Sequence, residues 1–266
     1  MKNLRNGEFF GQTNEKLSFD GLTITDTEYT HPYVDWHYHE NPYFTFLLQG
    51  NMTEGNKKEI YDCSAGTLLY HHWEDAHYNI KLDIFTRGFH IEITEEWFEK
   101  FQLSKDVEGS FNIRKPASKL LIYNIFKESK LTDKAFELSI NQILLNLFSQ
   151  LSNQRQSSEK KPVWVNQIDE ILHESFTEKL NLTELSKTLN IHPMHLSRDF
   201  QKYFQCNLGE YIRKLKVEKS LILLSQNDSL SEVALECGFA DQSHFIRCFK
   251  KNMGITPLKY KNIMKK

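Results

Sequence analysis

The sequence lacks the features that mark membrane, exported and disulfide-stabilised proteins. No apolar run approaches the roughly 20 residues that span a bilayer, and no apolar stretch of a signal peptide follows the first residues. The few cysteines contain no CxxC pair, so we expect reduced, packed thiols and neither a disulfide framework nor a zinc knuckle. They are Cys63, Cys206, Cys237 and Cys248. These absences predict a cytoplasmic protein without membrane association.

Motifs for catalysis are also scarce. The chain has no clear Ser/His/Asp arrangement, Gly-rich phosphate loop or paired-carboxylate motif. We therefore predict no enzyme activity, no catalytic residue and no cofactor. What the 266 residues do contain is 39% hydrophobic and 13% aromatic side chains, which is enough for one or two ordinary cores.

The net charge of −2 conceals two halves of opposite sign. A polar stretch at 152–159 has the composition of an interdomain linker. Residues 1–159 hold 16 Lys and Arg against 23 Asp and Glu, or −7, whereas residues 160–266 hold 17 against 12, or +5. A basic module beside an acidic one is typical of a polyanion-binding protein with a second domain, although such a charge also occurs on ordinary solvated surfaces.

The acidic half begins with β-rich sequence and ends with helices. Segments 21–25, 43–48 and 89–93 are rich in β-branched and aromatic residues and predict strands of a sandwich or barrel. From about residue 119 to 151 the apolar residues recur at three to four positions, which predicts helices. The second of these helices has surplus apolar residues, which would either form a homodimer interface or be buried in their own domain. They are Ile143, Leu145 and Phe148.

The basic half contains an internal repeat. Residues 182–186 match residues 230–234 at an offset of 48, and residues 195–202 match residues 244–251 at an offset of 49. Each copy therefore consists of two segments joined by a turn, and the second turn is one residue longer.

Each copy of the repeat has the local signals of a helix-turn-helix. Thr183 and Ser231 are the expected N-caps of the first helices. The turns follow at Asn190 and Gly238, residue types that accept a left-handed backbone. The second helices are expected to begin near Pro193 in one copy and, in the other, after a cap at position 241.

The second helix of each copy has an apolar face and a basic face. Arg198 and Arg247 occupy equivalent outward positions. An α-helix fits the major groove of DNA, where an arginine can donate to guanine O6 and N7 together and lysines can neutralise phosphates. The alternative is that two amphipathic hairpins merely solvate a surface, but the presence of an outward arginine in both copies favours DNA binding.

Residues 233–260 closely resemble the signature of AraC/XylS-type transcription regulators. The resemblance implies two helix-turn-helix units, at about 182–204 and 230–252, joined by a long helix over about 208–224. It implies base contacts from Met194, Ser197, Arg198, Gln242, Ser243, Ile246 and Arg247, and backbone contacts from Lys202, Lys250 and Lys251. The first unit departs from the family pattern at Gln205, Leu208 and Lys216, where Gly, Pro and Arg are usual.

The N-terminal half resembles the cupin-like sensor domain of the same family. His37 and His39 are two residues apart, so on a strand they point to one side, and Gly50 follows at the cupin interval. Gly66 leads to His77 at the spacing of the second cupin motif. The resemblance implies an effector site containing His37, His39, Tyr43 and His77.

Three imidazoles could also hold Zn, Fe, Ni or Cu. However, Tyr43 stands where metal-binding cupins carry Glu, and His72 and Glu74 stand where the second motif has Pro and Gly. We therefore favour an effector pocket, or polar strand faces, without a metal. His71 and His72 are adjacent on a presumed strand and are expected to point to opposite sides.

The predicted fold is α+β with two domains. Residues 1–151 form a cupin-like β-barrel with trailing helices for sensing and dimerisation, residues 152–162 form a linker, and residues 163–266 form an all-α DNA-binding domain. The predicted function is sequence-specific transcription regulation by an effector-responsive activator. The expected partners are double-stranded promoter DNA, a small-molecule effector, a second copy of the chain and, for an activator, RNA polymerase.

Two other classes remain open at this point. One is a metal-dependent cupin enzyme, such as an isomerase or dioxygenase, with the helical half as an accessory; the missing cupin glutamate counts against it. The other is an architectural or protein-binding module without an effector.

Overall fold

The computed structural model describes residues 1–81, 84–103, 107, 109–131, 135–156, 161–226 and 229–264. They form two compact units, Met1–Ser152 and Asn153–Lys266. Over these ranges, no helix has the combination of length and apolar character that crossing a membrane requires.

In the described ranges, the strands of the first unit form two separate sheets. The five-stranded sheet has the order β1-β4-β9-β6-β7 and the six-stranded sheet the order β11-β8-β5-β10-β3-β2. The strands are β1 (Lys2–Leu4), β2 (Gln12–Phe19), β3 (Leu22–Glu28), β4 (Tyr33–His39), β5 (Tyr43–Gln49), β6 (Asn51–Asn56), β7 (Ile60–Ser64), β8 (Leu68–His71), β9 (His77–Lys81), β10 (Arg87–Ile93) and β11 (Phe111–Asn112). The predicted β-rich first domain is therefore confirmed, and its strands lie in two sheets that are not closed into one barrel.

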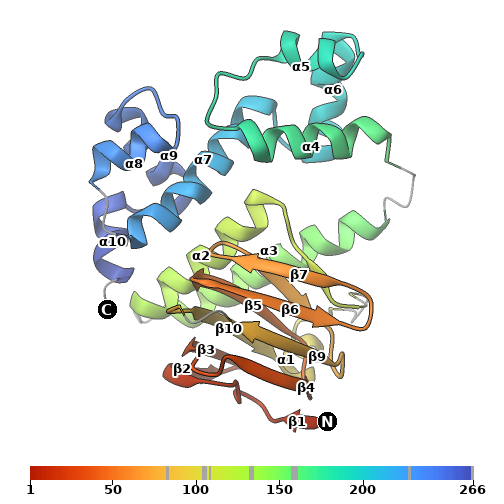
Figure 1. Ribbon diagram of the computed structural model, residues 1–266, viewed down its shortest axis with the longest axis vertical. Coiled ribbons are helices and arrows are strands. Elements are labelled where there is room, and N and C mark those ends of the chain that lie inside the picture. The colour runs from red at the N-terminus through yellow and green to blue at the C-terminus, as the bar shows by residue number, and fades with distance from the viewer. Residues whose placement is uncertain are drawn as a thin grey trace. The chain divides into compact units, whose positions relative to one another are not determined.

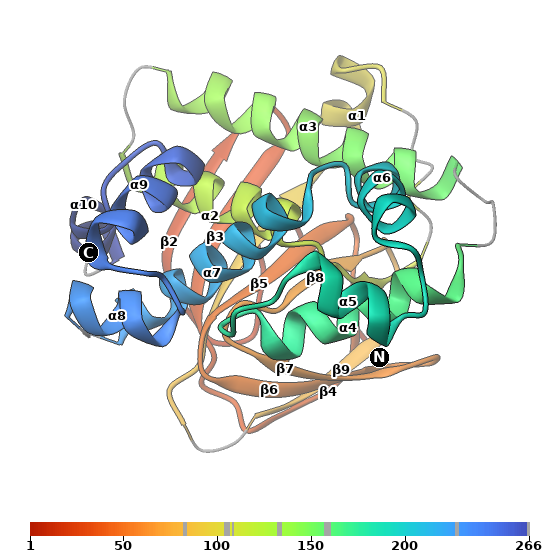
Figure 2. The same cartoon turned by 90° about the horizontal axis from the view of Figure 1, so that it is seen from above.

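The six-stranded sheet separates an apolar layer from a polar one. On β5 and β10, alternate residues point to opposite faces. Phe44, Phe46 and Phe89 pack against rings of the helices α2 (Pro116–Leu131) and α3 (Phe136–Gln156). Figure 2 shows both helices on the side of this sheet away from β4, β6 and β9. Phe44 and Phe46 thus belong to the core beneath the helices and do not line the space between the sheets.

Helix α3 is buried on more of its surface than its sequence alone indicated. Phe148 lies against Phe44 of the sheet and also against Trp97 and Phe98 of the short helix α1 (Glu95–Lys100). Of the two alternatives for Phe148, burial within its own domain is therefore the one that the structure confirms. The apolar residue that α3 leaves most exposed is Leu138, at 73%.

A buried ion cluster joins α2 to the six-stranded sheet. Asp26 on β3 accepts two hydrogen bonds from Arg87 on β10, at 2.7 and 2.6 Å, and one from Lys130 on α2 at 2.7 Å. Lys130 also contacts Glu15 on β2. Burial tends to raise the pKa of Asp26, but the bonds from the two cations outweigh it and hold the pKa below its usual value.

The second unit is helical (Figure 1). Its helices are α4 (Val163–Ser175), α5 (Leu182–Thr188), α6 (Pro193–Phe204), α7 (Leu208–Ser225), α8 (Leu230–Glu236), α9 (Gln242–Met253) and α10 (Pro257–Met264). Helix α3 of the first unit continues to Gln156, so the start of the predicted linker is helical. Residues 157–160 of that linker lie outside the described residues.

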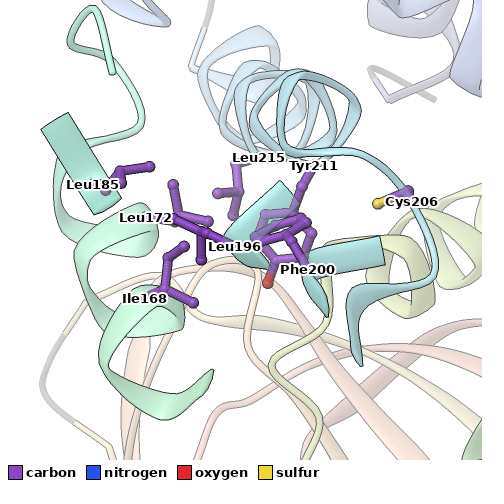
Figure 3. Close-up of a cluster of buried hydrophobic side chains, with 8 residues drawn as sticks. All are labelled: Ile168, Leu172, Leu185, Leu196, Phe200, Cys206, Tyr211 and Leu215. Atoms are coloured by element: carbon purple, nitrogen blue, oxygen red, sulfur yellow. The ribbon is translucent and has the colours of Figure 1, made fainter. Parts of the chain in front are cut away.

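The first helix-turn-helix, α5 and α6, has its own apolar core. Leu185 from α5 and Leu196 and Phe200 from α6 are buried against α4 and α7. Figure 3 shows these side chains converging with Ile168 and Leu172 of α4. Burying the apolar stripes of four helices in one cluster fixes the orientation of α6 within the unit.

The helix starts are set by side-chain caps, two of them earlier than the sequence indicated. Asn181 caps α5 by accepting from the amide of Glu184, and Ser229 caps α8 with a capping box. Thr183 and Ser231, the predicted caps, lie inside these helices. Asp241 does cap α9, as predicted.

The turn of the second helix-turn-helix lies against the segment between α4 and α5, next to the first helix-turn-helix. Gly238 has φ of 71°, and a Cβ there would lie 2.2 Å from the carbonyl oxygen of Thr177, between α4 and α5. Lys216 of α7 donates to the carbonyl oxygen of Gly238. Lys216, one of the departures from the family pattern, therefore joins the linking helix to this turn.

We expect Asp26→Asn to destabilise the first unit by about 3 kcal/mol or more, because two buried cations lose their charged partner. The matched control is Glu15→Gln, which alters a half-exposed partner of the same Lys130 and should change stability by less than about 1 kcal/mol. Urea unfolding followed by circular dichroism measures both. Equal losses of stability in the two variants would show that the burial of Asp26 does not determine its contribution to stability.

We expect Gly238→Ala to destabilise the second unit by about 2 kcal/mol or more, because it combines a left-handed backbone with a backbone collision. Gly209→Ala in α7 is the control: its Cβ would first meet the flexible Arg213 guanidinium at 3.3 Å, and alanine favours a helix by up to about 1 kcal/mol. Thermal and urea unfolding should show a lower stability than the wild type for Gly238→Ala and a higher stability for Gly209→Ala. A neutral Gly238→Ala would refute the close contact with Thr177.

Candidate nucleic-acid interface and sensor site

The two predicted recognition helices are strongly amphipathic. Leu196 and Phe200 in α6 and Phe245 and Phe249 in α9 are all 1% exposed or less. Their i, i+4 spacing places each pair on one face of its helix, toward the core. The opposite face of each helix is left to solvent.

The predicted nucleic-acid contacts occupy these outward faces. Every predicted contact except one is exposed, and Ile246 is half-buried. The exposed residues are Met194, Ser197, Arg198 and Lys202 on α6, and Gln242, Ser243, Arg247, Lys250 and Lys251 on α9. Each helix therefore presents one continuous face with arginine near its middle and lysine toward its C-terminal end.

The two arginines differ in their surroundings. Arg198 donates from Nε to Asp199 at 2.9 Å and lies 3.3 Å from His195 Nδ1. The hydrogen bond from Arg198 lowers the pKa of Asp199 below its usual value. Within the described part of the chain, Arg247 has no ion-pair or hydrogen-bond partner. Arg247 can therefore meet an acceptor on a ligand directly, whereas Arg198 must first leave Asp199.

One predicted base contact is held by the neighbouring helix. Ser231 of α8 donates its hydroxyl to Gln242 Oε1 at 2.7 Å. This bond leaves the Gln242 amide nitrogen available as a donor. Ser231 therefore orients Gln242 and does not cap its own helix.

The predicted sensor residues meet between the two sheets. His37 and His39 on β4, His77 on β9 and Tyr43 on β5 are all buried. The rings of His37 and His77 are 4.2 Å apart, and those of His39 and Tyr43 are 4.4 Å apart. The Tyr43 hydroxyl donates to His77 Nε2 at 3.0 Å. The three cupin-like histidines thus lie on one side of the strands and share one space.

Three further polar residues lie in this space that the sequence analysis did not assign to the site. Glu54 on β6, His71 on β8 and His90 on β10 are each no more than 3% exposed. His71 points inward and stacks on Tyr43, with ring centroids 4.2 Å apart, while His72 is half-buried outside. A usable signal was present for His90, which alternates with the apolar Phe89 and Ile91 along a predicted strand.

Burial keeps these side chains uncharged. Removal from water lowers the pKa of His39 to about 2 and those of His77 and His90 to about 3, and it lowers the pKa of His37 and His71 as well. It raises the pKa of the Glu54 carboxyl to about 8. Neutral imidazoles retain a lone pair, so the space is lined by potential metal ligands and hydrogen-bond acceptors.

The N-terminal segment closes this space. The Gly7 amide donates to Glu92 Oε2 at 2.6 Å, and the following Phe9 stacks on His90 with ring centroids 3.7 Å apart. Phe10 packs edge-on against His37 at 5.0 Å. The cavity that remains beside the histidines has a volume of about 30 Å³. That is room for a water molecule or a single ion.

A larger cavity lies elsewhere in the first unit. Its volume is about 610 Å³, and Tyr70, Trp73 and Phe98 contribute aromatic walls. Lys58, Asp75 and Glu95 add charged groups to its lining. This cavity has the size of an organic-ligand site.

Two sets of side chains in the histidine space could hold a metal ion. In the set His37, His39 and His77, and in the set Glu54, His71 and His77, one ligand atom per residue lies within 4.8 Å of the others. His77 belongs to both sets.

Known proteins match most strongly in the second unit. Residues 185–263 match the family model described as a helix-turn-helix domain. The chain is 34% identical over 112 residues to the bifunctional transcriptional activator/DNA repair enzyme AdaA of Bacillus subtilis, covering 41% of this chain and 53% of AdaA. It is 29% identical over 112 residues to the Msm operon regulatory protein of Streptococcus mutans, covering 42% of this chain and 40% of that protein. The matches thus span about half or less of these relatives.

Weaker similarity extends over most of the chain. The transcriptional activator RhaR of Mannheimia succiniciproducens is 22% identical over 259 residues, covering 91% of each protein. Among solved structures, ToxT of Vibrio cholerae matches with a TM-score of 0.39 and 12% identity, covering 91% of this chain and 98% of that one.

We expect Arg247→Ala and Lys251→Ala to affect nucleic-acid binding differently. Loss of an arginine that bonds a base should cost about 1 to 3 kcal/mol and relax the preference at one or two base pairs. Loss of a lysine that bonds phosphate should weaken all sequences alike and reduce the salt slope by about one. Binding selection from a random DNA library, with titrations of the selected sites, measures both effects. Unchanged sequence preference in Arg247→Ala would mean that another face of α9 reads the bases.

Proposed function

We propose that the chain is a sequence-specific DNA-binding transcription regulator of the AraC/XylS type, because residues 185–263 match the helix-turn-helix family model. The observation that carries the proposal is the pair of recognition helices, α6 and α9. Each has an exposed basic face opposite a buried apolar face. Two such helices joined through α7 suit successive segments of a major groove.

The proposal assigns different roles to the exposed residues of these helices. Arg198 and Arg247, with the neighbouring polar residues, face the base edges, where bidentate hydrogen bonds specify sequence. Lys202, Lys250 and Lys251, near the helix C-termini, contact the DNA backbone, which positions the protein without specifying sequence. The relatives named as transcriptional activators support this reading and favour an activator that contacts RNA polymerase.

We further propose that the first unit senses a small ligand and mediates homodimerisation. The histidine space with His37, His39, Tyr43 and His77 is the ligand site, and its small volume favours a very small ligand unless Phe9 and Phe10 move. The exposed Leu138 on α3, with the half-buried Ile143 and Leu145, offers an apolar surface for a second copy. We also propose that the protein acts in the cytoplasm, as a promoter-binding regulator would.

If the second unit binds DNA through several phosphates, its affinity should depend steeply on salt. Raising salt from about 50 to 200 mM should weaken binding to a promoter fragment by a few orders of magnitude, through release of condensed counterions. Fluorescence anisotropy with the full chain measures this. The double variant Lys250→Gln, Lys251→Gln should show a shallower slope, whereas Lys100→Gln in the first unit should not. Binding that is flat across this salt range would refute the proposal.

A further inference from the structure

We propose that Glu54, His71 and His77 bind one divalent transition-metal ion, such as Zn²⁺, between the two sheets. The three side chains come from β6, β8 and β9, and their ligand atoms lie within 4.8 Å of one another. All three residues are at most 3% exposed. The set combines two imidazoles and a carboxylate, which are usual ligands of Zn²⁺ in proteins.

A buried nitrogen without a partner points to a missing ligand. His71 Nε2 is shielded from solvent and, among the described residues, has no hydrogen-bond partner. The nearest candidate, Glu54 Oε1, is 3.5 Å away. A buried polar atom left without a bond costs about 1 to 3 kcal/mol. An ion between His71 and Glu54 would satisfy both atoms.

Surrounding bonds orient the other ligand atoms inward. His77 Nδ1 donates to the Asp75 carbonyl oxygen at 3.1 Å, so the lone pair of this ring is on Nε2, which faces the interior and Tyr43. Asn79 donates to Glu54 Oε2 at 3.1 Å, which leaves Oε1 toward His71. Such second contacts fix the tautomer and direction of ligands in metal sites.

Charge favours this set over the three cupin-like histidines. His37, His39 and His77 are equally close, but they offer only neutral ligands for a dication in a space closed by Phe9 and Phe10. An ion removed from water needs compensating charge, and Glu54 can supply it by releasing its proton when the ion binds. Glu54 and His77 both line the cavity of about 30 Å³, which has room for a single ion.

Metal binding is independent of whether the second unit binds DNA. Only the further step, that the ion acts as the effector, rests on the proposed function. Metal content and DNA affinity are therefore measured separately, so that failure of one does not imply failure of the other.

The test uses the full chain, stripped with a chelator and dialysed against buffered Zn²⁺. Elemental analysis should find about one ion per chain, and Co²⁺ loading should give visible absorption bands of an N/O site. Glu54→Gln, which preserves shape, and His71→Ala should each weaken binding by about tenfold or more. His72→Ala, altering the adjacent histidine outside the space, is the matched control and should bind like the wild type. Circular dichroism checks folding.

Two outcomes would overturn the assignment. Far less than one ion per chain after reloading would exclude a metal site in this space. Loss of binding in His37→Ala together with wild-type binding in Glu54→Gln would give the ion to the three cupin-like histidines and not to Glu54, His71 and His77. A chain that binds Zn²⁺ but no DNA would refute only the proposed function.

Discussion

Two recognition helices can read one stretch of DNA together only if their separation is fixed, and in this chain it depends on the close approach of the Gly238 turn to the first subdomain. The turn can approach so closely because glycine has no Cβ to meet the Thr177 carbonyl. Lys216 ties the same turn to α7, the helix that links the two subdomains. The family pattern has arginine where this chain has Lys216. The lysine ammonium group donates one hydrogen bond to the Gly238 carbonyl oxygen. The geometry of α6 and α9 is thus set by backbone contacts remote from their exposed faces.

A different constraint organises the first unit. The six-stranded sheet must be apolar toward α2 and α3, yet its other face is lined by Tyr43, His71 and His90. These groups are sequestered by the second sheet and by Phe9, so they remain neutral and rigidly placed. A polar layer that water cannot reach is expensive unless hydrogen bonds or ligands satisfy it. The proposed ligand or ion would satisfy imidazole nitrogens of this space, His39 Nδ1 and His71 Nε2, that have no hydrogen-bond partner among the described residues.

The sequence predicted most where signals are local. The helix-turn-helix pairs follow from left-handed turn residues, a cap at Asp241 and apolar residues four apart, all within a dozen positions. The cap assignments at Thr183 and Ser231 failed because Asn181 and Ser229, two residues earlier, compete for the same role and precede leucines that begin the helices. A polar composition at 152–156 likewise could not distinguish the end of a helix from a linker.

For the histidine space, the sequence predicted only which residues of one strand point to the same side. The two-residue spacing of His37 and His39 placed them on one side, but Glu54 and His71 join them across two sheets through pairings that the sequence does not encode locally. The burial of Phe148 could not be decided from the sequence for a similar reason: α3 is covered by the sheet on one side and by α1 on another, so two apolar stripes are buried.

The alternation along β5 and β10 ties the ligand-lined layer and the hydrophobic core to one register. A single inserted or deleted residue in either strand would turn Tyr43 or His90 toward the helices and their phenylalanine neighbours toward the histidine space. Neither layer can be remodelled by such a change without destroying the other. Changes to the proposed ligand layer are therefore tolerated only as substitutions that keep strand length constant, while insertions and deletions are tolerated in the connecting loops.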